Sequence, residues 1–194
     1  IYFEDHIKTK RWYFNIGMRL TNFANIEANY INLQPRILSR FRINEKIAFT
    51  LVGNRRFQYL HLIANPAIQL PNDLWLPSDG NIKPQELHET EFSIDYKVRP
   101  RFTLNATAYY RIMHNLYAYP ETFDYLSNTA DYSQYDFLVN GNGESKGIEL
   151  IADFADAKKG LLVSYTISES TRQFDSLNLG KPFYSNFDNR HQIK

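Results

Sequence analysis

The sequence of 194 residues contains no cysteine, which excludes a disulfide scaffold and any metal site built from thiolates. It also lacks an apolar run near the roughly 18 residues that a membrane-spanning helix needs. The formal net charge is only +1, which argues against a protein that binds nucleic acid through bulk electrostatics. The sequence therefore excludes three classes: helical membrane proteins, disulfide-rich domains and strongly basic nucleic-acid binders.

Patterns that carry catalysis are absent as well. The five histidines are scattered and show no metalloprotease spacing. No nucleophile elbow is present, and no pair of carboxylates stands out as a glycosidase pair. Gly141–Gly147 is rich in glycine, but a strand rather than a helix is predicted after it, so we interpret it as a flexible hairpin entry and not as a phosphate-binding loop. We expect no enzyme activity, no cofactor and no resident metal.

What the sequence does contain is a strict alternation of apolar and polar residues, together with an aromatic content of 15%. Within Lys10–Leu20 the apolar residues share one parity and the polar residues share the other. Successive side chains of a strand point to opposite faces, so this segment predicts a strand with one apolar and one polar face. The two sets are Trp12, Phe14, Ile16, Met18 and Leu20 against Arg11, Tyr13, Asn15, Gly17 and Arg19.

The same alternation recurs along the chain. No strand is predicted before Lys10, so we expect the partner of this first strand to precede Ile1. Because the chain begins at Ile1 without a methionine or a signal segment, we interpret it as an internal piece of an exported protein. The further predicted strands are Tyr30–Ile43, Ile47–Asn54, Glu89–Val98, Phe102–Met113, Gly147–Phe154 and Leu161–Arg172, and Arg190–Lys194 begins an eighth.

The connections alternate between short and long. Short turns are predicted at Asn44–Lys46, Arg99–Arg101 and Asp156–Gly160, and long irregular loops at about 62–85 and 114–145. Outer-membrane barrels have short periplasmic turns and long extracellular loops. The sequence therefore predicts the all-β class, as a transmembrane antiparallel up-and-down β-barrel of which this chain supplies about seven or eight strands. Aromatic residues near strand ends on the apolar parity are typical of interfacial girdles: Trp12, Phe41, Phe102, Tyr110 and Phe154.

Several strings, in this order and spacing, resemble the barrel of outer-membrane TonB-dependent receptors. The resemblance extends from about Trp12 to Lys194. Each string alone is weak, and the ordered set is what carries the resemblance. The strings are Gln58–Leu62, Leu70–Pro77, Lys83–Gln85, Tyr109–Asn115, Gly141–Leu150 and Tyr165–Ser170.

The resemblance implies that residues 1–194 form a barrel segment of an energy-coupled importer in the outer membrane of a Gram-negative bacterium. Such receptors enclose a plug domain and couple to the TonB complex through a short box, and neither the plug nor the box is visible here. The implied partners are outer-membrane lipid, the TonB complex, a small-molecule, glycan or peptide ligand and, in some members, a surface lipoprotein. The implied cargo is a scarce nutrient: a siderophore, cobalamin, an oligosaccharide or a peptide.

Two sets of candidate site residues follow. On the long loops, aromatic and polar residues suit ligand binding, with loop packing as the alternative: Tyr59, His61, Asp73, Trp75, Tyr117 and Tyr119. On the polar parity, basic residues are expected to contact the plug or attract anions, with a merely hydrated lumen as the alternative: Arg11, Arg19, Arg36, Arg40 and Arg42. Acidic residues on the same parity, such as Glu91 and Asp95, favour an interior of mixed sign.

Two other functions remain open from the sequence. A self-contained eight-stranded outer-membrane barrel with a structural or adhesive role fits the chain length and strand count. A soluble β-sandwich that binds carbohydrate is the third interpretation, and it needs a second sheet to cover the apolar parity.

Overall fold

The computed structural model describes residues 1–63, 74–120, 138–156, 158–186 and 188–194, and most of them lie in β-strands. Apart from one short 3₁₀ turn, η1 (Asn178–Gly180), the described elements are strands. Their bounds are β1 (Tyr2–Lys8), β2 (Trp12–Ala24), β3 (Asn29–Arg42), β4 (Ile47–Gln58), β5 (Leu60–Ile63), β6 (Leu74–Pro77), β7 (Gln85–Arg99), β8 (Phe102–Ala118), β9 (Val139–Ala155), β10 (Gly160–Phe174), β11 (Phe183–Tyr184) and β12 (His191–Ile193).

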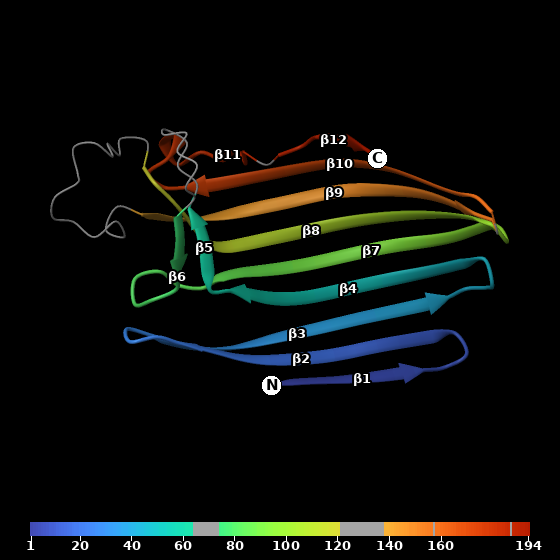
Figure 1. The fold of residues 1–194 in the computed structure, drawn as a ribbon, viewed down its shortest axis with the longest axis horizontal. Coiled ribbons are helices and arrows are strands. Elements are labelled where there is room, and N and C mark those ends of the chain that lie inside the picture. Colours follow the sequence, from blue (N-terminus) through green and yellow to red (C-terminus); the bar gives the residue numbers. More distant parts are fainter. Residues whose placement is uncertain (64–73, 121–137, 157, 187) are drawn as a thin grey trace.

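Ten of these strands form one antiparallel sheet in the order β1-β2-β3-β4-β7-β8-β9-β10-β11, and the tenth, β12, also pairs with β10 (Figure 1). The strands β5 and β6 form a separate hairpin. Each long strand pairs with its neighbour in the chain, which is an up-and-down topology. The expected fold class is confirmed. The sheet does not close on itself within the described residues, so a closed eight-stranded barrel is not the arrangement observed.

The predicted strands are all present, and most are longer than expected. One expectation was wrong: the first predicted strand does have a partner within the chain, because β1 pairs with β2 from Tyr2 opposite Arg19 to Lys8 opposite Tyr13. In β1 the apolar alternation of Phe3 and Ile7 is interrupted by the charged Asp5 between them, and for this reason the sequence did not predict the strand. The loop at 62–85 was also expected to be irregular, yet β5 and β6 form a hairpin there.

The glycine-rich segment is likewise not a flexible hairpin entry, because it lies inside β9. A Cβ added at Gly141 would lie 2.3 Å from Phe174 Cδ1, and one added at Gly143 would lie 2.8 Å from Leu116 Cδ1. These glycines therefore leave room for large side chains of the neighbouring strands. Phe174, Leu116 and Leu177 form a small core at this place.

The two faces of the sheet differ in polarity. On β2 the apolar parity is open, with Ile16 45% and Met18 46% exposed, whereas Asn15 on the other parity is 9% exposed. Cross-strand register keeps each parity on one face: Ile16 lies opposite Ile37, and Asn15 opposite Leu38. We call the face that carries Ile16 and Ile37 the apolar face and the other the polar face. This polarity is the reverse of what a water-soluble sheet with one covered face shows.

The two ends of the sheet also differ. The short connections β1–β2, β3–β4, β7–β8 and β9–β10 lie together at one end, and the long connections and the β5–β6 hairpin lie at the other (Figure 1). We call these the turn end and the loop end. At the loop end a second small core packs against the hairpin, formed by Ile63, Leu76, Ile82 and Tyr119. The predicted alternation holds for the connections after β4 and β8, which are long, whereas the β2–β3 connection at the loop end, residues 25–28, is as short as the turns at the other end.

One seam interrupts the sheet. The ladder between β3 and β4 stops at Arg36 opposite Asn54, although β2–β3 and β4–β7 continue toward the loop end. Beyond that point side chains join the two strands. Gln34 Oε1 accepts a hydrogen bond from the Phe57 N–H at 3.3 Å, and the hydroxyl of Tyr59 accepts one from Asn32 Nδ2 at 3.1 Å.

In the part of the chain that the structure describes, no helix has the length and apolar character required to cross a membrane.

Candidate functional site

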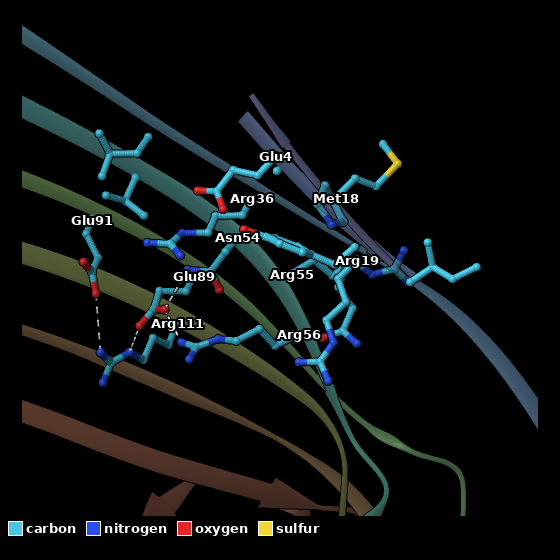
Figure 2. A pocket seen from close by; sticks show the side chains of 17 residues that line it. Glu4, Met18, Arg19, Arg36, Asn54, Arg55, Arg56, Glu89, Glu91 and Arg111 are labelled. Atoms are coloured by element: carbon cyan, nitrogen blue, oxygen red, sulfur yellow. Dashed lines mark hydrogen bonds and ion pairs between the residues drawn. The ribbon is translucent and has the colours of Figure 1, made fainter. Parts of the chain in front are cut away.

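The polar face is hollowed toward the loop end into a groove of about 1120 Å³, to which β1, β2, β3, β4, β7 and β8 contribute side chains (Figure 2). Small-molecule sites are usually about 300–1,000 Å³, so the groove can hold a ligand of that class. Its ionisable side chains are arginines and glutamates: Arg19, Arg36, Arg55, Arg56, Arg111, Glu4, Glu89 and Glu91.

Glu89 lies at the centre of this cluster, and its side chain is 4% exposed. The carboxylate forms ion pairs with Arg56 and Arg111 and accepts a hydrogen bond from Asn54 Nδ2 at 2.9 Å (Figure 2). Strand register explains the cluster, because Glu89 stands opposite Asn54 on β4 and opposite Arg111 on β8. A buried carboxylate is costly unless it is paired and hydrogen-bonded, and here it is both.

Arg111 also lies 3.6 Å from Glu91, measured from Nη2 to Oε1. Glu89 and Glu91 together hold Arg111, and Glu89 holds Arg56, so these two arginines are largely neutralised within the protein. The groove therefore has a fixed, mixed-charge floor, as expected from the acidic residues on the polar parity.

The five arginines predicted on the polar parity divide into three situations. Arg19 and Arg36 line the groove, are exposed, and form no ion pair with any described residue. Arg40 pairs with Asp95 at 2.8 Å and donates to Thr50 Oγ1 at 3.3 Å. Arg11 and Arg42 lie at the turn end. Only Arg19 and Arg36 thus bring unpaired positive charge to the groove.

Four of the predicted loop residues, Tyr59, His61, Tyr117 and Tyr119, lie at the loop end and pack against protein. The ring of Tyr59 stacks on Phe23 with centroids 5.0 Å apart, and its hydroxyl bonds Thr21 and Asn32. Tyr119 is 6% exposed in the small core, and the hydroxyl of Tyr117 accepts a hydrogen bond from the Lys83 N–H at 2.8 Å.

His61 belongs to β5 of the β5–β6 hairpin, and its side chain is wholly buried. Its Nε2 lies 3.0 Å from Ser78 Oγ, its ring meets Tyr117 edge-on at 5.2 Å, and its Nδ1 has no hydrogen-bond partner. Burial lowers the pKa of His61 to about 4, so the imidazole is neutral at physiological pH. Its geometry is that of a packing residue.

Trp75 on β6 is 58% exposed, which leaves it open to a ligand, and Asp73 lies outside the described residues. No group of three or more histidine, cysteine, aspartate or glutamate residues that could hold a metal ion occurs among the residues described.

Sequence reasoning missed Glu89, Arg56 and Arg111 as site residues. The sequence placed these residues on the polar face, since Glu89 shares the parity of Glu91 and Asp95. Arg111 likewise shares the parity of Asn105. What the sequence did not show was the register that places Glu89 between two arginines.

Comparison with solved structures finds the same kind of fold in a longer protein. Over 89% of its length the chain is similar to the FrpB iron transporter from Neisseria meningitidis (F3-3 variant), with a TM-score of 0.59 and 18% sequence identity. The match covers 25% of that chain, so residues 1–194 span about a quarter of its length. No protein-family model and no curated protein sequence matches the chain. At this identity the likeness shows the fold.

Proposed function

We propose that residues 1–194 form part of the barrel of a TonB-dependent receptor that imports a scarce nutrient across the outer membrane of a Gram-negative bacterium. The observation that carries this proposal is the inverted polarity of the sheet. Over most of the length of the long strands one face exposes apolar side chains, whereas the charged floor of the groove lies on the opposite face. The resemblance of the sequence to this family and the likeness of the fold to an iron transporter support the same function.

Lipid is the natural partner of the apolar face. Contiguous exposed apolar patches beyond a few hundred Å² mark membrane or protein interaction sites, and this face runs across every long strand. Within a bilayer an outward apolar band and a polar interior are what a transmembrane barrel requires. On this basis the turn end faces the periplasm and the loop end faces the outside.

Transport in this proposal rests on binding and translocation, without catalysis. The groove of about 1120 Å³ lies toward the loop end, where a ligand arriving from outside first meets the lumen. Arg19 and Arg36 offer unpaired charge to anionic groups of a ligand or to carboxylates of a plug domain. Trp75 offers an exposed aromatic surface on β6, at the loop end. The cargo is a siderophore, cobalamin, an oligosaccharide or a peptide, and the energy comes from the TonB complex through a plug and box outside this segment. A surface lipoprotein that lids the barrel is a further partner in this proposal.

The test is growth of a strain that lacks the gene, on iron-limited medium and on medium with a glycan as the only carbon source. We expect a growth defect on one of the two, restored by the wild-type gene and dependent on the TonB complex. Arg19→Gln/Arg36→Gln should restore growth less well than Lys83→Gln/Lys181→Gln, which removes the same charge from loop-end sites away from the groove. Normal growth of the deletion strain at limiting concentrations of each nutrient class, with the protein absent from the outer membrane fraction, would contradict the proposal.

A further inference from the structure

Basic residues gather at the turn end of the sheet. We define the turn rim as residues 8–11, 42–46, 97–101, 153–156 and 158–160, which make up the four short connections and the strand ends beside them. The rim has ten basic residues and three acidic residues, Glu45, Asp153 and Asp156. All ten basic residues are exposed: Lys8, Lys10, Arg11, Arg42, Lys46, Lys97, Arg99, Arg101, Lys158 and Lys159.

The rim does not neutralise itself. Arg101 pairs with Asp156 at 2.8 Å, but three carboxylates cannot balance ten cations. Adjacent hairpins in a sheet lie roughly 10 Å apart, twice the strand spacing of about 4.8 Å, which is about one Debye length in physiological salt. Salt screens much of the repulsion between neighbouring turns at this distance, and an anionic partner between them would remove the rest.

The loop end provides an internal comparison. Arg55 there pairs with Glu86 at 2.6 Å, whereas Lys83 and Lys181 form no ion pair with a described carboxylate. The rim carries a formal charge of +7, ten cations less three carboxylates, whereas the whole chain carries +1. The rest of the chain therefore sums to −6, so the excess of positive charge belongs to the rim.

The position of the rim identifies the partner. The apolar face reaches the turn end with aromatic side chains: Trp12 packs on Phe41 with ring centroids 4.5 Å apart, and Phe102 stands opposite Phe154. Aromatic residues of this kind mark the level of lipid headgroups. The rim cations lie just beyond them, and long basic side chains at that level extend their charge into the headgroup region.

We propose that the turn rim binds anionic phospholipid headgroups of the membrane leaflet at the turn end. The proposal rests on the proposed function, because it needs the apolar face in a bilayer. The four turns spread their charge along the whole edge of the sheet (Figure 1), as a lipid leaflet requires and a single docked protein does not. Beneath the β1–β2 turn a hollow of about 60 Å³ is lined by Lys8, Lys10, Arg11, Arg40 and Arg42, which provides one place where charge converges.

Trp12 permits a local test in the full-length protein. The protein is reconstituted into phosphatidylethanolamine vesicles that contain brominated phosphatidylglycerol or, in parallel, brominated phosphatidylcholine. Bromine quenches nearby tryptophan, and the difference between the protein and its Trp12→Phe variant isolates the signal of Trp12. We expect stronger quenching by phosphatidylglycerol, and we expect high salt to abolish the difference.

Lys10→Gln/Lys46→Gln should lower the relative association of phosphatidylglycerol, by up to about fivefold for each cation removed. Lys10→Arg/Lys46→Arg should preserve it, and Lys83→Gln/Lys181→Gln, at the opposite end, should leave it unchanged. The shift of the folded band on unheated gels checks that every variant is folded.

Equal quenching by the two lipids in the wild-type protein, or an unchanged ratio in Lys10→Gln/Lys46→Gln, overturns the proposal. If that ratio is unchanged while energised uptake is lost, the rim binds an acidic periplasmic protein instead. The quenching experiment needs no transport ligand. A lipid preference without uptake would therefore refute the transport function and leave the rim proposal intact.

Discussion

Glu89 offers the sharpest test of how the groove is held together. Glu89→Gln keeps the size of the side chain but removes the charge that neutralises Arg56 and Arg111. Breaking a fully buried ion pair costs about 3–5 kcal/mol. The side chain of Glu89 is 4% exposed, but those of Arg111 and Arg56 are 36% and 56% exposed, so water recovers part of their charge. We therefore expect a loss of about 2 kcal/mol in the free energy of unfolding, below the range for full burial.

The assay is denaturant unfolding of the full-length protein in vesicles, followed by tryptophan fluorescence. Glu169→Gln is the matched control, because Glu169 is 33% exposed and its contacts to Lys146 and Arg190 are long, at 3.7 and 3.8 Å. Such exposed pairs contribute about 0–1 kcal/mol. A double-mutant cycle with Arg111→Met should return a coupling of about 1–3 kcal/mol. A loss for Glu89→Gln no larger than that for Glu169→Gln would refute the view that Glu89 organises the groove.

Three further changes test other parts of the structure. Leu51→Arg, on the apolar face, should lower the free energy of unfolding in vesicles by about 2–4 kcal/mol. Thr50→Arg, on the polar face, should lower it much less, and equal losses would contradict the assignment of the faces. Gly141→Ala places a Cβ against the ring of Phe174 and should lower the free energy of unfolding by about 1–3 kcal/mol. The gel shift of the folded band after heating measures this loss, and an unchanged stability would show that Phe174 moves freely. The pKa of His61 is about 4 in the folded protein and about 6.5 in the unfolded chain, so acid protonates the unfolded state first. The free energy that holds the β5–β6 hairpin closed should therefore fall by at most about 3 kcal/mol as the pH drops from about 6.5 to about 4. Hydrogen exchange corrected for intrinsic rates measures this loss, and His61→Gln should remove the pH dependence.

The fold could be predicted from the sequence because alternate residues of a strand lie on opposite faces, so a strand with one apolar and one polar face has an alternating sequence. The long, regular strands such as β2 and β8 were found for this reason. β1 was missed because Asp5 interrupts its apolar parity, and β5 and β6 because they are only four residues long and lie among prolines. The segment Gly141–Gly147 was misread because glycine predicts turns locally. The glycines are needed there because the large side chains of Phe174 and Leu116, on neighbouring strands, occupy the space beside them.

The site was less accessible to sequence reasoning. Parity places a charged residue on the polar face but does not show which charges meet, since that depends on register between strands. Arg36 and Arg40 had the same expected role, yet Arg40 has Asp95 within 2.8 Å and Arg36 has no ion pair among the described residues. Likewise His61 was predicted to face a ligand from its place on a loop, and the hairpin that buries it was not predicted.

The side-chain seam between β3 and β4 gives the sheet an uneven stiffness. Elsewhere, pulling neighbouring long strands apart breaks a main-chain ladder, whereas at the loop-end half of this seam it breaks a few contacts of Gln34, Asn32 and Tyr59. A hydrogen bond of this kind contributes only about 1 kcal/mol net. Within the described sheet, neighbouring long strands are therefore held most weakly at this half of the seam, beside the groove, whereas the main-chain ladder from Arg36 to Arg42 holds the turn-end half of the same two strands together.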